Sequence, residues 1–234
     1  MTGIPLNERI IFALDLASPE EARQWVLRLE GSIRFYKVGL QLFLADWFDT
    51  VDWITARGHK VMLDLKLFDV PATVRLAIQQ LTGRRITYAT VHAPAAKAAV
   101  EAGSDAGILA VTVLTSLGQD ELDEMGFQRS IEDLVSIRAA KALRHGCKGI
   151  VCSGLEAARL RRDLGEDFLI VTPGIRTEQE AAQRPDDQKR VLTAGSAIRN
   201  GADHVVVGRP IRSADDPLET VKVLQEEIRQ SLQT

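Results

Sequence analysis

Cysteine is scarce in this chain of 234 residues, which argues against two kinds of site. Cys147 and Cys152 are its two cysteines, and the four histidines are scattered along the sequence. A redox-active CxxC pair needs closer spacing, and a zinc site needs more ligands gathered together. We therefore expect two buried, unreactive thiols and no bound metal.

Long apolar runs are missing as well, and so is a strong excess of charge of either sign. The longest apolar stretches, such as residues 107–114, are too short to cross a bilayer, and the opening MTGIPLNERI does not look like a secretion signal. The 29 basic and 32 acidic residues leave a formal net charge of -3, which argues against a nucleic-acid partner. We expect a cytoplasmic protein that binds neither nucleic acid nor membranes.

What the sequence does contain is a regular alternation of strand-like and helical segments, with no Ser/Gly-rich linker between them. Several helix starts carry a capping residue three positions before a glutamate, as Ser18 stands before Glu21. The eight predicted strands are residues 10–14, 35–38, 60–65, 86–91, 107–113, 149–152, 168–171 and 204–207.

Eight strand–helix units predict an α/β fold, a (β/α)8 or TIM barrel that forms one domain over residues 1–234. Parallel strands need crossover helices, and closure of the barrel removes exposed sheet edges. A doubly wound open sheet is the alternative. In a barrel the carboxyl ends of all strands meet on one face, so Asp15, Lys37, Asp64 and Lys66 are expected to gather there.

The segment DLKLFDVPAT, residues 64–73, places unusual charge at the end of an apolar strand. Side chains two apart on a strand share a face, so Asp64 and Lys66 should point the same way while the intervening leucines pack behind them. Asp69 follows on the turn, and a helix is expected to begin at Pro71. Charges beside an apolar core are costly unless they are paired, which predicts a chemical role for this segment.

Two glycine–arginine motifs predict a phosphate site. GRP at residues 208–210 follows the eighth predicted strand, and PGIR at residues 173–176 follows the seventh. Loops at these positions of a barrel commonly bind phosphate, because free backbone N–H groups and a guanidinium converge on the anion. We expect a phosphorylated substrate, and the long connections 115–129 and 173–190 are candidate lids.

Together these motifs resemble the orotidine 5'-phosphate decarboxylase family of bacterial type, whose members make UMP in pyrimidine synthesis. The resemblance spans essentially the whole chain. It is carried by ALD ending at Asp15, FYKVG around Lys37, DLKLFDVPATV from Asp64, VTVLTS ending at Ser116, PGIR ending at Arg176, DDQKRV around Gln188 and VVVGRPI around Arg209.

The resemblance implies a role for individual residues. It implies a catalytic tetrad of alternating charge, and in this chain the matching residues are Lys37, Asp64, Lys66 and Asp69. Lys66 would protonate the carbon that loses carbon dioxide. Asp69 and Thr73 would reach into the neighbouring subunit of a homodimer. Among the implied substrate contacts, Asp15 would bind the ribose, and Thr115 or the adjacent Ser116 would bind the pyrimidine. Lys37 is a further implied contact. The residues implied around the phosphate are Gln188, Gly208, Arg209 and Arg176.

No cofactor is implied, and elementary chemistry agrees. Loss of carbon dioxide from a pyrimidine leaves a carbanion in the ring plane, so a fixed cation must stabilise it, and Lys66 supplies that cation and then a proton. Opposite charges about 4 Å apart attract by roughly 4 kcal/mol at an effective dielectric constant of 20, so flanking aspartates should keep both lysines protonated. Phe68 and Ala72 replace the histidine and asparagine usual in the family, which concerns local loop contacts.

Three other interpretations remain open at this point. The charged residues could form a structural ion-pair network at the mouth of the barrel. The chain could be a magnesium-dependent sugar-phosphate decarboxylase or aldolase of the same superfamily, although those enzymes carry an acidic residue at the position of Lys37. It could also be a noncatalytic barrel that senses a phosphorylated metabolite through GRP and PGIR, but such a protein would not need four buried charges.

Overall fold

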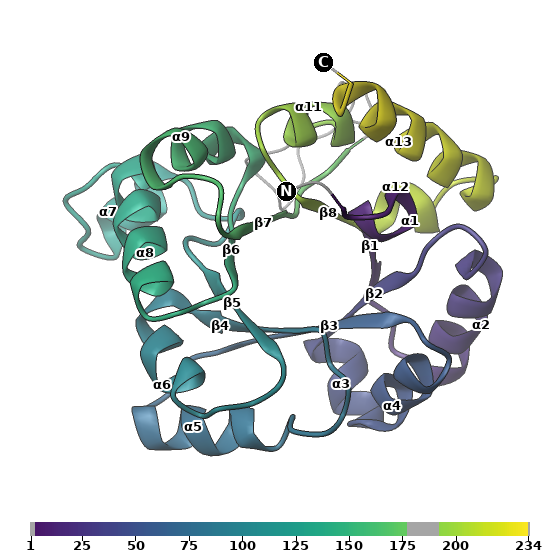
Figure 1. Ribbon diagram of the computed structural model, residues 1–234, viewed down its shortest axis with the longest axis horizontal. Helices are drawn as coiled ribbons and strands as arrows, with labels where there is room; N and C mark the ends of the chain where they lie inside the picture. Colours follow the sequence, from purple (N-terminus) through teal and green to yellow (C-terminus); the bar gives the residue numbers. More distant parts are fainter. Residues whose placement is uncertain (1–2, 177–191, 234) are drawn as a thin grey trace.

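The computed structural model describes residues 3–176 and 192–233, and in it eight parallel strands close into a barrel in chain order (Figure 1). The closed barrel is the predicted fold, and the open-sheet alternative is excluded. The strands are β1 (Ile10–Leu14), β2 (Phe35–Gly39), β3 (Lys60–Leu67), β4 (Tyr88–His92), β5 (Gly107–Val111), β6 (Gly149–Val151), β7 (Leu169–Thr172) and β8 (His204–Val207).

Helices surround the ring of strands on the outside (Figure 1). They are α1 (Leu6–Arg9), α2 (Pro19–Leu29), α3 (Leu40–Asp46), α4 (Asp49–Ala56), α5 (Pro71–Gln79), η1 (Ala93–Ala95), α6 (Ala96–Val100), α7 (Gln119–Glu124), α8 (Ile131–Arg144), α9 (Gly154–Leu164), α11 (Ala194–Arg199), α12 (Arg209–Arg212) and α13 (Pro217–Ser231). Among the described residues, no helix is long and apolar enough to cross a membrane.

Local signals place several helix starts correctly. The Ser18 hydroxyl accepts a hydrogen bond from the backbone N–H of Glu21, and α5 begins at Pro71 as predicted. Strand ends are less accurate. The fourth strand begins at Tyr88 rather than at residue 86, the fifth ends at Val111 rather than at residue 113, and the third continues to Leu67. Apolar runs predict burial, but buried residues continue beyond the end of a strand into the loops.

Strand side chains alternate between two apolar layers. In β1, Ile10, Phe12 and Leu14 pack in the layer between strands and helices, whereas Ile11 and Ala13 belong to a smaller cluster inside the barrel. Other residues of the inner cluster are Phe35, Met62, Leu109, Val111, Val151, Val171 and Val206. Both clusters are almost fully buried, so the barrel is a packed core rather than a pore.

The same alternation aims the candidate site residues inward. Ala13, Phe35 and Met62 lie inside the barrel, so the next positions of the same parity along each strand continue toward its carboxyl end on that face. Those positions are held by Asp15, Lys37 and Asp64. The apolar side chains that fill the barrel are therefore followed by charged side chains at the carboxyl-terminal face of the barrel.

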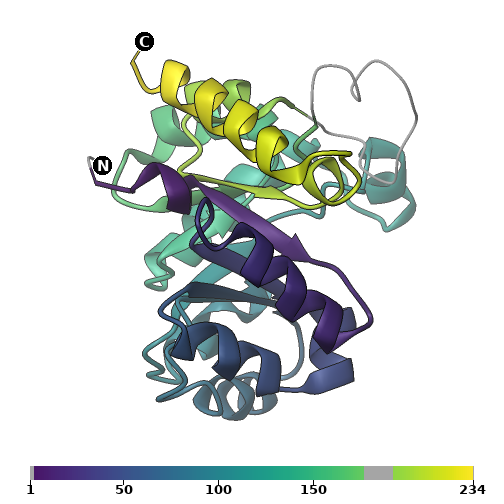
Figure 2. The ribbon, with the colours of Figure 1, turned by 90° about the vertical axis from the view of Figure 1, so that its right-hand side faces the viewer.

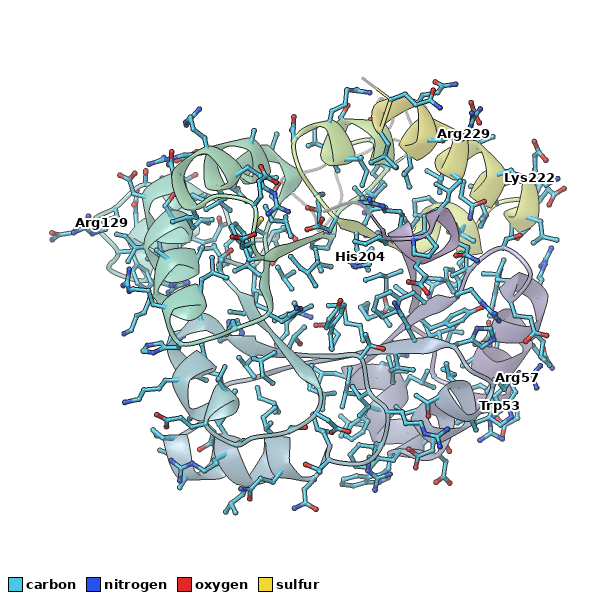
Figure 3. The ribbon with its side chains drawn as sticks, in the orientation of Figure 1. Trp53, Arg57, Arg129, His204, Lys222 and Arg229 are labelled. Carbon is cyan, nitrogen blue, oxygen red and sulfur yellow. The ribbon has the colours of Figure 1, made fainter. Side chains whose placement is uncertain are left out.

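The opposite end of the barrel is closed by its own polar contacts. There α1 leads into β1, which points away toward the other end (Figure 2). The His204 ring lies inside the ring of strands (Figure 3), and burial lowers its pKa to about 4. The neutral ring donates from Nδ1 to the Glu8 carbonyl oxygen at 2.9 Å.

A buried ion pair joins α9 to the loop before β8 at this end. Arg161 Nη2 lies 2.6 Å from Asp203 Oδ2, and both side chains are less than a tenth exposed. The same carboxylate oxygen accepts from the backbone N–H of Ile170 at 2.8 Å. Loss of one partner from such a pair leaves an uncompensated buried charge, which destabilises a protein strongly.

We predict that Asp203→Asn lowers the free energy of unfolding by about 3 kcal/mol, because Arg161 would lose its buried counterion and keep only the exposed Glu166, whose carboxylate lies 3.7 Å away. Chemical denaturation measures the change. Glu226→Gln is the control, since it breaks the exposed pair between Glu226 and Arg229 and should leave the unfolding midpoint unchanged. Equal midpoints for the two variants would contradict the importance of the buried pair.

Candidate functional site

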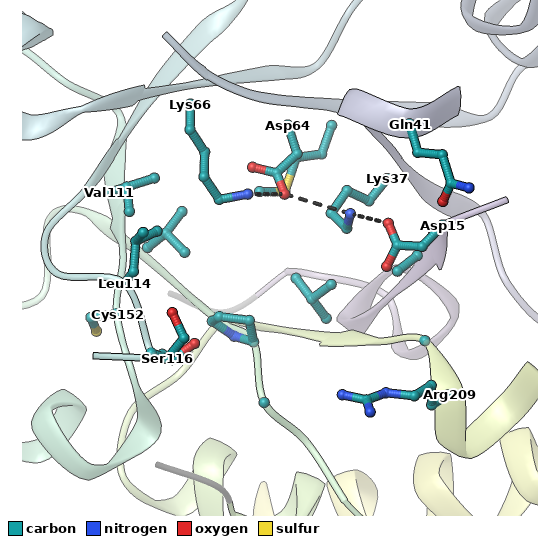
Figure 4. Close-up of a pocket in the computed structure, with 18 of the residues that line it drawn as sticks. Asp15, Lys37, Gln41, Asp64, Lys66, Val111, Leu114, Ser116, Cys152 and Arg209 are labelled. Atoms are coloured by element: carbon teal, nitrogen blue, oxygen red, sulfur yellow. Dashed lines mark hydrogen bonds and ion pairs between the residues drawn. The ribbon is translucent and has the colours of Figure 1, made fainter. Parts of the chain in front are cut away.

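A cavity of about 430 Å³ opens at the carboxyl ends of the strands (Figure 4). Most of the residues predicted for the site line it, and they come from six of the eight strand–loop units. They are Asp15, Lys37, Asp64, Lys66, Thr115, Ser116, Arg176, Gly208 and Arg209. Thr115 and Ser116 both reach the cavity wall, so the choice between them stays open.

Three strands contribute a continuous chain of opposite charges across the cavity (Figure 4). Lys37 Nζ lies 2.7 Å from Asp15 Oδ1 and 3.5 Å from Asp64 Oδ2. Asp64 Oδ2 also accepts a hydrogen bond from Lys66 Nζ at 2.8 Å. The carboxylate of Asp64 therefore stands between two ammonium groups, which confirms that Lys37 and Lys66 lie in one site.

Burial and charge act in opposite directions on the central pair. Burial favours the neutral acid, but Lys37 and Lys66 outweigh it and hold the pKa of Asp64 below its ordinary value. Burial likewise opposes the charge of Lys37, yet Asp64 and Asp15 raise its pKa above the ordinary value. Both groups are therefore charged at neutral pH, and for Lys37 this is the effect expected from the flanking carboxylates.

The backbone of β3 departs from a regular strand where it carries these charges. Leu63 pairs with Ala89 and Leu67 with Val91, so Asp64, Leu65 and Lys66 together stand opposite Thr90 alone. Lys66 has a φ of 49°, a left-handed conformation that is unusual for a lysine. Across this bulge Asp64 and Lys66 both line the cavity, and Leu65 and Leu67 pack against the outer core, as predicted.

A glycine on β2 leaves room for the first ion pair. A Cβ added at Gly39 would lie 3.0 Å from Lys37 Nζ and 3.2 Å from Asp15 Oδ1. Any larger residue would therefore press against both charged groups. The glycine of the FYKVG motif matters here for close approach rather than for backbone flexibility.

Asp69 and Thr73 are predicted site residues that do not line the cavity of their own chain. Both are exposed, and Asp69 Oδ1 accepts a hydrogen bond from the N–H of Val70 at 2.6 Å. Gln188, the remaining predicted residue, lies outside the described residues. The other members of the predicted set are gathered in one cavity.

Three arginines line the side of the cavity formed by β7, β8 and the loops after them. Arg209 lies across the cavity from Lys66 (Figure 4). Arg176 Nη1 donates to the carbonyl oxygen of Ile175 at 2.7 Å. Arg212 donates to the carbonyl oxygen of Asp15 and so ties the loop after β8 to the end of β1. A cationic region at this place suits an anionic group some distance from the paired charges.

Sequence reasoning missed three polar residues of the site: Gln41, Thr90 and Arg212. Gln41 and Arg212 line the cavity, and Thr90 bonds to Asp64 from β4. The alternation of side chains along the strand could have indicated that Thr90 faces inward, because it shares the inward face of β4 with Tyr88. Arg212 follows GRP by two positions, but a pattern of one arginine near another does not reveal which of them faces a cavity.

Within residues 3–176 and 192–233, no group of three or more His, Cys, Asp or Glu side chains is arranged to hold a metal ion. Cys147 and Cys152 are both buried and form no disulfide, and burial raises the pKa of the Cys147 thiol to about 12. This agrees with the unreactive thiol expected for Cys147, whereas Cys152 lines the cavity.

Comparison with known proteins gives consistent results. A sequence model of the orotidine 5'-phosphate decarboxylase / HUMPS family matches residues 8–224. The chain is 49% identical over 229 residues to orotidine 5'-phosphate decarboxylase of Methylococcus capsulatus, with 97% of this chain and 94% of that protein covered. It is 44% identical over 232 residues to the enzyme of the same name from Xylella fastidiosa, with the same coverage.

Solved structures extend the comparison to the fold. The crystal structure of orotidine 5'-phosphate decarboxylase from Lactobacillus acidophilus superposes with a TM-score of 0.81 at 34% identity, covering 94% of this chain and 99% of that one. The structure of the enzyme from Pyrococcus horikoshii superposes with a TM-score of 0.76 at 26% identity and the same coverage.

Proposed function

Because this chain belongs to the orotidine 5'-phosphate decarboxylase / HUMPS family, its reaction is the decarboxylation of orotidine 5'-phosphate to UMP in pyrimidine biosynthesis, and we propose that Lys37, Asp64, Lys66 and Asp69 carry out that reaction. The observation that supports this assignment best is the carboxylate of Asp64 between two ammonium groups in the cavity.

Lys66 is proposed to act on the carbon that loses carbon dioxide. Departure of carbon dioxide leaves an electron pair in the plane of the ring, where an adjacent ammonium group stabilises it by direct charge attraction. The same ammonium group then donates a proton to that carbon, which gives UMP and leaves Lys66 neutral until it takes a proton from solvent. Lys66 is one-third exposed, so water can reach it for this last step.

Asp64 and Lys37 prepare Lys66 for this role. Lys66 Nζ donates a hydrogen bond to Asp64 Oδ2 at 2.8 Å, which fixes the position of the amino group that is proposed to act as the acid. Lys37, held by Asp15 and Asp64, keeps Asp64 ionised. Since these charges are fixed before substrate binds, little reorganisation is needed during the reaction. This arrangement needs no metal or organic cofactor.

Lys37 also argues against the sugar-phosphate alternative. An acidic residue at its position would complete an oxygen-rich magnesium site with Asp64, whereas an ammonium 3.5 Å from Asp64 repels a metal ion. A sensor without catalysis is disfavoured by the cost of burying Lys37 and Asp64, each less than a tenth exposed, for a function that needs neither.

The remaining cavity residues suit the rest of the nucleotide. Asp15 lies between Lys37 and the loop after β8, where its carboxylate can accept bonds from ribose hydroxyls. Thr115 or Ser116 can bond to the polar edge of the pyrimidine. Gly208, Arg209 and Arg176 line the side of the cavity away from Lys66 and are proposed to bind the phosphate. Gln188 is proposed as a further phosphate contact.

We propose a homodimer in which Asp69 and Thr73 complete the site of the partner subunit. Both residues are exposed and lie beside the exposed apolar side chains of Phe68, Val70 and Leu76, each more than 60% accessible. The neighbouring β2–α3 unit also exposes Leu40, Leu44 and Trp47. Such a surface is typical of a protein contact, and its burial would bring Asp69 toward a second chain.

The first test is turnover itself. We predict that the purified protein consumes orotidine 5'-phosphate, followed by the loss of ultraviolet absorbance, and that a chelator leaves the rate unchanged. Lys66→Ala should abolish turnover while retaining affinity for UMP, because it removes the proton donor and not the phosphate contacts. Lys222→Ala, at an exposed position of α13, is the matched control. An active Lys66→Ala enzyme would exclude Lys66 as the acid.

Arg209→Ala is predicted to raise KM about 100-fold, because a charge-assisted contact to phosphate contributes about 3 kcal/mol to binding. Initial rates over a range of substrate concentrations measure the effect, and Arg229→Ala, an exposed residue of α13, should behave as the unmodified enzyme. An unchanged KM would show that the phosphate lies elsewhere.

The shared site predicts complementation between two inactive variants. Refolding a mixture of Lys66→Ala and Asp69→Ala subunits should restore about a quarter of the activity, because half of the dimers are mixed and one of their two sites is intact. Size-exclusion chromatography establishes that dimers form. If Asp69 acts within its own chain, every site in the mixture carries a defect, and the mixture stays inactive.

A further inference from the structure

Thr90 on β4 holds together the two residues that the mechanism depends on most, and it has no contact with the cavity itself. We propose that Thr90 is a positioning residue of this enzyme, which sets both the carboxylate of Asp64 and the backbone of Lys66 in their reactive arrangement. The inference rests on the proposed roles of Asp64 and Lys66.

The directions of the hydrogen bonds follow from the chemistry of the groups. The Thr90 hydroxyl oxygen lies 3.0 Å from the backbone N of Lys66 and 2.9 Å from Asp64 Oδ1. A backbone N–H can only donate, so the hydroxyl accepts there and its own proton is free for Asp64. Asp64 Oδ1 must then be an acceptor, as an ionised carboxylate is.

The hydrogen bond from the Thr90 hydroxyl to Asp64 fixes the orientation of the Asp64 carboxylate. With Oδ1 bound to Thr90, Oδ2 is the oxygen that faces Lys66 and Lys37. Without the hydroxyl, Oδ1 would be buried without its donor, and the carboxylate could rotate to share its oxygens differently between the two lysines. A rotation of this kind moves Lys66 Nζ away from the carbon that it must protonate.

The second hydrogen bond, from the backbone N–H of Lys66 to the Thr90 hydroxyl, compensates for a backbone bond that is lost at the bulge. Three residues of β3 stand opposite Thr90, so the regular ladder of backbone bonds is interrupted where Lys66 takes its left-handed conformation. The Thr90 hydroxyl replaces the missing backbone acceptor for the Lys66 N–H. Serine, threonine and few other residues could provide both a donor and an acceptor from one atom at this place.

Thr90 is suited to rigidity. It is 1% exposed, it lies in the middle of β4, and its branched side chain has few rotamers. Val91 beside it is paired with Leu67 at the far end of the bulge. The hydroxyl is therefore held by the barrel wall, and the charged residues are held by the hydroxyl.

The test compares Thr90→Val, which removes the hydroxyl and keeps the shape, with Thr90→Ser, which keeps the hydroxyl. Thr90→Val should lower kcat by about 30- to 100-fold, the loss expected when reacting groups are misplaced by about 1 Å, while KM and UMP affinity change less than about threefold. Thr90→Ser should retain kcat within about threefold. The matched control is Thr172→Val, a buried strand threonine whose hydroxyl has no hydrogen-bond partner among the described residues.

The pH profile of kcat separates positioning from general stability. The titratable groups facing Asp64 are Lys37 from β2, Lys66 from β3 and His92 from β4, and all three remain in the variant. Thr90 helps to hold the pKa of Asp64 low, so its loss raises that pKa. Activity should consequently begin to fall at a higher pH in Thr90→Val than in the unmodified enzyme, as acid protonates Asp64.

The outcomes are distinct. A lower kcat with a shifted acid limb, recovered in Thr90→Ser, supports the proposal. Normal kcat in Thr90→Val, or a loss explained by a smaller folded fraction with an unchanged acid limb, overturns it. If Thr90→Val does not fold, Thr90→Ala and Thr90→Ser replace the comparison, and equal activity in these two overturns the proposal. Failure of the unmodified enzyme to consume substrate would instead contradict the proposed function.

Discussion

The carboxylate of Asp64, held between the ammonium groups of Lys37 and Lys66, is the interaction on which the rest of the site depends. Each charge is costly at the mouth of an apolar barrel, and each is stabilised by its neighbour of opposite sign. Removal of Asp64 would leave Lys66 without the carboxylate that holds it and Lys37 with Asp15 alone. The array is therefore stable as a whole, and it provides a field that is present before any substrate arrives.

The barrel makes this arrangement possible through two geometrical features. The inward-facing apolar side chains of β1, β2 and β3 are followed by charged residues at the carboxyl ends of these strands. Three strands therefore place charged groups in the same cavity. Asp64 and Lys66 line the same cavity wall on either side of the bulge in β3, and Thr90 is bonded to both. The ion pair between Arg161 and Asp203 closes the opposite end, away from this chemistry.

Much of this could be predicted, and the exceptions have physical reasons. The alternation of strands and helices predicted the closed barrel, and motifs located Asp15, Lys37, Asp64, Lys66 and Arg209. Strand ends were less accurate, because apolar residues such as Ile86 remain buried beyond the hydrogen-bonded ladder. Thr90 and Arg212 were missed since each acts through a contact with a residue far away in the sequence. Strand alternation indicates that Thr90 faces inward, but it does not reveal that the hydroxyl binds Asp64 and Lys66.

The sequence by itself determined which chemical groups are available and on which face of each strand they stand, because side-chain alternation is a local property of an extended backbone. It also determined the family, through motifs that keep their order along nearly the whole chain. Tertiary structure alone decided which oxygen of Asp64 meets which lysine, and that Thr90 supports them across a bulge. Distances of about 3 Å between separate strands depend on closure of the barrel, and closure is a property of all eight strands together.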